Sequence, residues 1–261
     1  FNRSGAVAVS SAISGTGTLE QKGAGTLTLS GANSYTGATT VSAGILGLSG
    51  TLSGSIVTVE DPGVFNEAAT GVIAGSGVTF THNSSGTSTL AGSNTFTGAI
   101  TVLNGGELDL ANWGGSTLGT VNVTLGTLGI SGSATYNLGG NSLFVGNLGF
   151  GGTVNQTGGT VTFTSGNALL VGNGAGLGSS GIYNLSGGTL TNFTSTARGV
   201  MLGVNNTCYG TFNLSGAGNL ALGIAELAVG RNDAASTDCT VTFNQTGGTA
   251  TVGNFSVGGQ S

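Results

Sequence analysis

Residues Gly25 to Leu46 read GTLTLSGANSYTGATTVSAGIL, and the pattern returns at Gly86 to Leu108 as GTSTLAGSNTFTGAITVLNGGEL. Matching residues, such as Tyr35 and Phe96, lie 61 positions apart. Neither copy contains His, Cys, Lys or Arg, and Glu107 is the only charged residue in the two. The repeated element is therefore a packing unit. A unit that cannot close a core by itself must stack on its neighbours.

The composition favours strands joined by tight turns. Among 261 residues there are 54 Gly and 1 Pro, hydrophobic residues make up 38% and charged residues only 5%. Collagen needs a strict Gly-X-Y period with abundant Pro, and disordered chains lack this many apolar residues. No apolar run approaches the roughly 20 residues of a membrane helix. We expect no membrane insertion.

From about residue 135 a second repeat replaces the first. It occupies residues 152–161, 181–190, 210–220 and 241–250, with YNLSGGTL at its centre in the second of these. Its asparagines are spaced by 29, 29 and 31 residues, at Asn155, Asn184, Asn213 and Asn244. Short strands separated by Gly-containing corners, with one unit per coil, predict an all-β parallel β-helix (a β-solenoid) with essentially no helix. We expect one continuous solenoid with two repeat types, at 1–134 and 135–261. A β-sandwich is the competing fold, and it explains the repeats less well.

Stacked coils place equivalent side chains in columns about 4.8 Å apart. One predicted column, inside the coil, contains Val154, Tyr183, Phe212 and Phe243. A second contains the four repeat asparagines, either at a corner or facing water. Because Gln156 and Gln245 occupy the position of Leu185 and Leu214, the pattern predicts a coil margin for that third column.

Residues 17–49 resemble the autotransporter-associated β-strand repeat of passenger domains, and residues 77–110 resemble it less closely. The residues that match best read GTLTLSGANSYTGATTVSAG. The resemblance implies a right-handed parallel β-helix located outside the cell at the bacterial surface. Members of this family include adhesins, stalks and enzymes, so the resemblance by itself leaves the task open.

The two cysteines occupy the same position of consecutive repeat units. Cys208 lies four residues before Phe212, and Cys239 lies four residues before Phe243. Stacking in register would bring their Cα atoms near 5 Å, inside the ~4.4–6.8 Å range of a disulfide. A disulfide also implies an oxidising compartment. The alternative is a thiol or metal pair, which lacks nearby partners in the sequence.

No residue pattern indicates an active site. Glu107 and Asp109 alternate on one strand face and could form a pair of acids, but no basic residue lies near them in sequence. Asp233 and Asp238 have the character of turn acids, and the solenoid calcium motif G-G-x-G-x-D is absent. We therefore expect no enzyme activity, no cofactor and no metal. The sequence places His82 in a loop.

The charge pattern argues against nucleic acid as a partner. Only Arg3, Lys22, Arg198 and Arg231 are basic, and the net charge is -5. Phosphate backbones need clustered cations. The sequence therefore favours a non-catalytic extracellular structural protein, a β-helical subunit or segment of a bacterial surface fibre or stalk.

Two alternative functions stay open. One is an adhesin or glycan-binding passenger domain that contacts surface glycans. The other is an ice-binding solenoid, which would require a regular Thr-x-Thr plane. For the fibre, we expect other copies of the chain as partners, because strand patterns begin within about five residues of Phe1 and are still present at Val252 to Val257. Unlike ends that meet head to tail produce an open filament.

Overall fold

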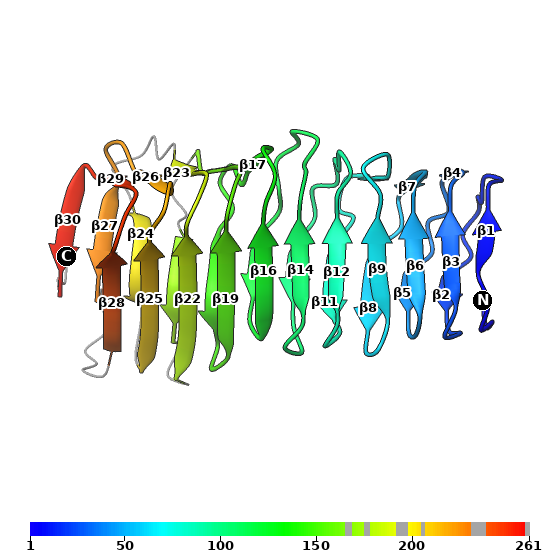
Figure 1. Cartoon of the computed structure of the whole chain (residues 1–261), viewed down its shortest axis with the longest axis horizontal. Coiled ribbons are helices and arrows are strands. Elements are labelled where there is room, and N and C mark those ends of the chain that lie inside the picture. Colours follow the sequence, from blue (N-terminus) through cyan, green and yellow to red (C-terminus); the bar gives the residue numbers. More distant parts are fainter. Residues whose placement is uncertain (165–168, 175–177, 192–197, 205–206, 231–238, 259–261) are drawn as a thin grey trace.

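The protein is a three-sided rod built from stacked coils (Figure 1). The structure, a computed structural model, describes residues 1–164, 169–174, 178–191, 198–204, 207–230 and 239–258. All the strand pairings given for these residues are parallel, and no helix occurs among them. The predicted all-β parallel β-helix is confirmed.

Two 11-stranded sheets run along the rod, and each coil contributes one strand to each of them. The front sheet consists of β1 (Val7–Val9), β3 (Thr26–Leu29), β6 (Ile45–Leu48), β9 (Val64–Glu67), β12 (Thr87–Leu90), β14 (Glu107–Leu110), β16 (Gly126–Ile130), β19 (Gly151–Gln156), β22 (Ser179–Leu185), β25 (Cys208–Leu214) and β28 (Cys239–Gln245). The back sheet consists of β2 (Leu19–Gln21), β5 (Thr39–Val41), β8 (Val57–Glu60), β11 (Phe80–Asn83), β13 (Ile100–Val102), β15 (Val121–Val123), β18 (Leu143–Asn147), β21 (Leu169–Asn173), β24 (Arg198–Val204), β27 (Glu226–Val229) and β30 (Asn254–Val257).

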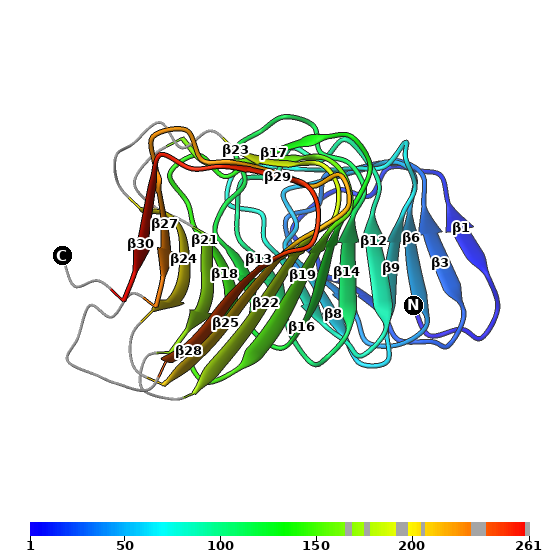
Figure 2. The same ribbon diagram turned by 60° about the vertical axis from the view of Figure 1, so that its left-hand side comes forward.

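The third side changes along the rod. Near the N-terminus it is a short sheet of β4 (Ala32–Asn33), β7 (Thr51–Ser53) and β10 (Val72–Ala74). From residue 135 it is the upper sheet, made of β17 (Thr135–Asn137), β20 (Thr160–Thr162), β23 (Thr189–Thr191), β26 (Asn219–Ala221) and β29 (Thr249–Thr251). Figure 2 shows the upper sheet spanning the space between the two long sheets. Both long sheets continue past residue 134, while the division into two repeat types stays a prediction.

The coil is right-handed. In Figure 1 the chain rises through the front sheet, crosses the top, and descends through the back sheet while it advances from right to left. This is the hand expected of parallel strands joined by crossovers, because twisted strands return to their sheet with least strain in that sense.

Alternation along each strand decides which residues form the core. In β3, Leu27 and Leu29 are buried, while Thr26 and Thr28 face outward. Strict period-two alternation is the pattern of a strand with one buried face. Because the strands are in register, the inward residues form continuous columns. One column of the front sheet contains Val7, Leu27, Leu46, Phe65, Ser88, Leu108, Leu128, Val154, Tyr183, Phe212 and Phe243.

Glycine is required where the back strands turn toward the front sheet. Gly146 and Gly172 have φ of 69° and 74°, in the left-handed region that favours glycine. A Cβ built on Gly172 would lie 2.5 Å from the carbonyl oxygen of Tyr209 on β25. The second repeat thus keeps a glycine after Val or Leu at this corner, because both the backbone conformation and the close approach of the sheets exclude a side chain.

Replacing Gly172 by Ala should lower stability by more than conformational strain alone. Gly77→Ala is the matched control, since Gly77 has φ of 75° but open space where a Cβ would lie. The control loses about 1–3 kcal/mol from strain, and Gly172→Ala adds the steric clash. Urea midpoints of the two variants measure the difference. Equal midpoints would contradict the close approach of the sheets.

Candidate functional site

An asparagine ladder runs up the outer face of the front sheet. Strands β19, β22, β25 and β28 place Asn155, Asn184, Asn213 and Asn244 directly in register. The Nδ2 of each later residue donates to the Oδ1 of the one before, over 2.8, 2.7 and 2.9 Å. The ladder thus faces outward, half-buried in its first three members. Each amide satisfies its neighbour, so the face is polar yet internally hydrogen-bonded.

The aromatic column lies on the opposite, inner face of the same strands. Tyr183 and Phe212 are fully buried and stack with ring centroids 5.2 Å apart and an interplanar angle of 1°. Phe212 and Phe243 stack at 5.5 Å and 13°. Val154 precedes Tyr183 in the register. Such stacked pairs contribute roughly 0.5–1.5 kcal/mol each beyond their area burial.

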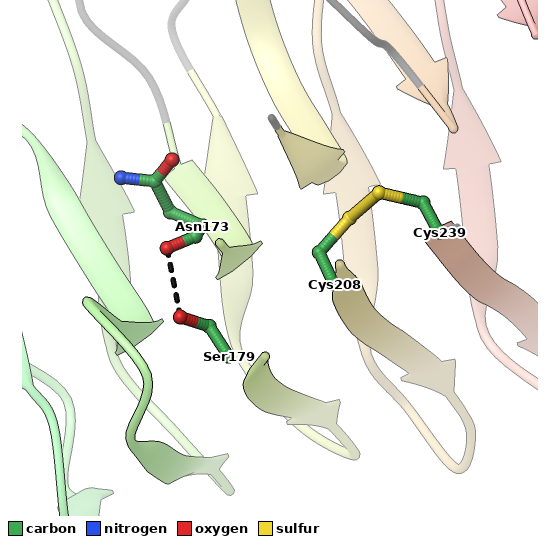
Figure 3. The surroundings of a disulfide bond; sticks show 4 residues. All are labelled: Asn173, Ser179, Cys208 and Cys239. Atoms are coloured by element: carbon green, nitrogen blue, oxygen red, sulfur yellow. Dashed lines mark hydrogen bonds between the residues drawn. A yellow bond between two sulfur atoms is a disulfide. The ribbon is translucent and has the colours of Figure 1, made fainter. Parts of the chain in front are cut away.

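The disulfide joins Cys208 on β25 to Cys239 on β28 (Figure 3). The two residues are register partners, with Cα atoms 4.6 Å apart. Ser179 occupies the same column one coil earlier, and its Oγ donates to the carbonyl oxygen of Asn173 over 2.9 Å (Figure 3). The bond is therefore a covalent rung between consecutive coils, as the 31-residue spacing predicts.

The third column differs from the sequence prediction. Gln156 is fully buried, and so are Leu185 and Leu214, so the prediction of a coil margin is wrong. The buried amide is tolerated because it is satisfied: Gln156 Nε2 donates to the carbonyl of Thr189 over 3.0 Å, and its Oε1 accepts from the Tyr183 hydroxyl. Gln245, in the last described coil, is exposed.

His82 also differs from its predicted position in a loop. It lies on β11, fully buried, and its Nε2 bonds the carbonyl oxygen of Gly86 over 3.0 Å. Because a carbonyl only accepts, Nε2 carries the proton. Gln21, one repeat length earlier, donates to the carbonyl of Gly25 in the same way over 2.9 Å. The offset of 61 places a corner donor at both positions, which the residue types alone did not suggest.

Two buried polar groups lie at the upper edge of the front sheet. The Oε2 of Glu67 accepts from Gly92 N at 2.8 Å and from Asn94 Nδ2 at 2.7 Å. The Oδ1 of Asn94 accepts in turn from Ile73 N. Burial raises the pKa of the Glu67 carboxyl, and the hydrogen bonds from Asn94 and Gly92 offset part of that rise. Asn33, the repeat equivalent of Asn94, likewise bridges neighbouring coils through backbone groups.

The two copies of the first repeat exchange polar for apolar residues as a set. The Tyr35 hydroxyl bonds Thr39 Oγ1 at 2.6 Å, and Thr39 Oγ1 bonds Ser55 Oγ at 2.7 Å. In the second copy the residues that correspond to Tyr35 and Thr39 are Phe96 and Ile100. Removing both partners together avoids an unsatisfied buried hydroxyl, whose cost is ~1–3 kcal/mol.

No cation forms a salt bridge with the two paired acids among the described residues. Glu107 and Asp109 lie on the outer face of β14, and Asp109 accepts from the Ser131 hydroxyl. The salt bridge between Lys22 and Glu20, at 3.3 Å, belongs to a distant coil. In the part of the chain that the structure describes, no group of three His, Cys, Asp or Glu side chains could hold a metal. Asp233 and Asp238 lie outside the described residues.

Trp113 covers the core where the third side has no strand. It is 5% exposed and packs edge-to-face on Phe96 with ring centroids 4.9 Å apart. Its indole Nε1 donates to the carbonyl of Ser116 over 2.9 Å. A sugar-stacking ring needs an open face, so this tryptophan is a structural residue.

A family model described as the passenger-associated-transport-repeat matches residues 19–48 and 80–110. The chain carries passenger-associated-transport repeats. The first match begins with the first residue of β2 and ends with the last of β6, and the second runs in the same way from β11 to β14. Each passenger repeat therefore comprises two back strands, two front strands and one passage over the third side.

Repeats of this type belong to autotransporter passenger domains, so the match indicates a passenger-type repeat, which implies secretion or exposure at the cell surface. No curated protein and no solved structure matches the chain. Within the described residues, no helix is long and apolar enough to cross a membrane.

Removing the disulfide should lower the free energy of unfolding. In the chain-entropy view, a cross-link over 31 residues contributes roughly 3–4 kcal/mol. The variant with Cys208→Ser and Cys239→Ser should unfold at lower urea than the oxidised protein, and a thiol reductant should shift the wild type alone. If the reductant left the urea midpoint of the wild type unchanged, the disulfide would not be stabilising.

His82→Gln should abolish a loss of stability in mild acid. Burial lowers the pKa of His82. Below pH about 6.5 the imidazole therefore becomes protonated in the unfolded chain while it stays neutral in the folded chain. The contribution of neutral His82 to the free energy of unfolding is fully present above that pH, and it is lost as the pH falls through the pKa of His82 in the folded state. Glutamine keeps the corner bond, as Gln21 does.

Urea midpoints of the wild type and His82→Gln, measured from about pH 8 to about pH 5 at constant salt, provide the comparison. The difference between the two should be constant at the upper end and should grow in favour of glutamine toward the lower end. Parallel curves would show that His82 has no coupling to folding.

Proposed function

We propose that this chain is a non-catalytic structural segment of a bacterial surface fibre or stalk, and that copies associate end to end. The observation that supports a structural role most strongly is the continuity of the two long sheets, whose described strands extend from Val7 to Val257. Strand pairing bonds each coil to the next through its backbone, and the polar ladders and the disulfide add side-chain bonds between coils.

The chemistry of the lateral surface supports a role without catalysis. Charged residues make up 5% of the chain, and the paired acids Glu107 and Asp109 have no basic partner among the described side chains. A β-helical hydrolase or lyase places acids together with cations in one cleft. A rod of neutral Thr, Ser, Asn and Gly provides length and a hydrated surface instead.

End-to-end association is supported by the geometry of the two edges. All pairings in the front sheet are parallel, with β1 at one edge and β28 at the other. The two edges present complementary strand faces, so a second copy could continue the sheet in the same direction. The same edges could equally pair with coils of a longer polypeptide, and the behaviour of this chain in solution separates the two cases.

An adhesin is the second candidate, and one residue favours it. Tyr209 on β25 is 50% exposed on the outer face of the front sheet, and Ile182 on β22 lies near it, 37% exposed. An exposed aromatic ring on the same outer face as a row of amides is a surface suited to a neutral glycan. A glycan array screened with Tyr209→Ala as the control would test this alternative.

Sedimentation over a concentration series, followed by electron microscopy, tests the fibre. The Val9 carbonyl accepts a hydrogen bond from the N–H of Ser30, which directly follows β3. Because the backbone groups of alternate residues point to opposite sides of a strand, the N–H and C=O of Ala8 point away from β3, toward the open edge. Ala8→Pro should reduce association, because it removes a donor at that edge without breaking a ladder bond. Ala8→Thr keeps the donor and should associate like the wild type.

Filaments of uniform width that shorten with Ala8→Pro alone would support the fibre. Single rods at every concentration, or equal association of both variants, would contradict it.

A further inference from the structure

The upper sheet presents a Thr-x-Thr pattern on its outer face. The sequence alone did not show that these residues lie together on one face. In β20 and β23 the outward residues are Thr160 and Thr162, then Thr189 and Thr191. Register pairing extends them into two rows across the five strands. The first row is Thr135, Thr160, Thr189, Asn219 and Thr249, and the second is Asn137, Thr162, Thr191, Ala221 and Thr251.

Buried side chains beneath the upper sheet hold these two rows in place. The residue between the two outward positions is buried in the first four strands, as Tyr136, Val161, Leu190 and Leu220. The Tyr136 hydroxyl also donates to the carbonyl of Leu110 over 2.7 Å. The register of the upper sheet has no shift in any of its four pairings. The upper sheet therefore holds its outward side chains at constant spacing.

The spacing is regular in two directions. Neighbouring strands lie about 4.8 Å apart, and alternate residues along a strand lie about 6.7 Å apart. Both distances are close to the oxygen repeats on the prism face of hexagonal ice. Thr side chains on a strand also have restricted χ1, which limits the directions that each hydroxyl and methyl can take. The interrupted row retains polar order at Asn137, whose Oδ1 accepts from Thr162 Oγ1 at 3.3 Å.

The chemistry of this face selects a neutral, ordered partner. None of the ten outward residues is charged, so a charged polymer finds no counter-charge there. None is aromatic, so the face lacks the stacking platform that sugars use. Hydroxyls in rows can anchor water by hydrogen bonds, and the methyls between them hold water in cages.

We propose that the upper sheet of β17, β20, β23, β26 and β29 binds ice, through a layer of water ordered by its two Thr-rich rows. This activity is independent of end-to-end association, because the rows lie along the side of the rod and need no second copy. It provides a surface protein with a means of attaching to ice or limiting its growth.

The experiment is ice-affinity partition of the fluorescently labelled protein, with labelled serum albumin as the background. The test variant carries Thr162→Tyr and Thr191→Tyr, which places two rings over the second row. The matched control carries Thr127→Tyr and Thr153→Tyr, which are register partners on the outer face of the front sheet. Urea midpoints establish that both variants are folded.

The wild type and the front-sheet variant should enter the ice, while the upper-sheet variant should fall to the albumin level. The isosteric pair Thr162→Val and Thr191→Val removes two hydroxyls with little change of shape, so it should lower partition even if the tyrosine variant fails to fold. The proposal is overturned if the wild type matches albumin, or if the front-sheet and upper-sheet variants enter ice equally.

Binding to microcrystalline cellulose in a parallel sedimentation assay covers the other flat, neutral lattice. Loss of cellulose binding in the upper-sheet variant, with no entry of the wild type into ice, would overturn the proposal in favour of a crystalline glycan.

Discussion

The structure depends on one constraint, the in-register parallel pairing of each coil with the next. Each strand of the two long sheets can satisfy its backbone groups only if the following coil returns to the same height and register. The result is that every strand position in the sequence becomes part of a column in space. A residue is tolerated at a position when its side chain packs against, or hydrogen-bonds to, the side chains directly above and below it. The repeats in the sequence reflect that requirement.

Polar residues enter the core where a column needs a donor or acceptor at a corner. Gln21, His82 and Gln156 each bond a corner carbonyl from inside the coil. The outer Asn ladder serves the same end by pairing amides between coils. The chain therefore obtains cohesion from many local bonds and one disulfide, with few charged residues. This mode of stabilisation needs few charged side chains on the lateral surface.

The sequence predicted most of the architecture because periodicity is a direct record of stacking. The spacing of Cys208 and Cys239 predicted a rung, and the strand alternation predicted the inner aromatic column. The sequence could not assign Gln156 or His82, because a polar residue type indicates exposure unless its partners are known, and those partners are carbonyl groups. The Thr rows of the upper sheet also escaped it, since they join residues 25 to 30 positions apart that become neighbours only in register.

The most direct test of the continuous register is a designed rung across the junction of the two repeat types. Thr127 on β16 and Thr153 on β19 are register partners on the outer face, and the natural rung of Cys208 and Cys239 joins register partners further along the same sheet. The double variant Thr127→Cys and Thr153→Cys should form a disulfide spontaneously, detected by peptide mapping, and should keep its urea midpoint or raise it. The pair Thr127→Cys and Asn155→Cys, out of register by two residues, should stay reduced. Preferential oxidation of the second pair, or failure of the first, would contradict a single in-register rod.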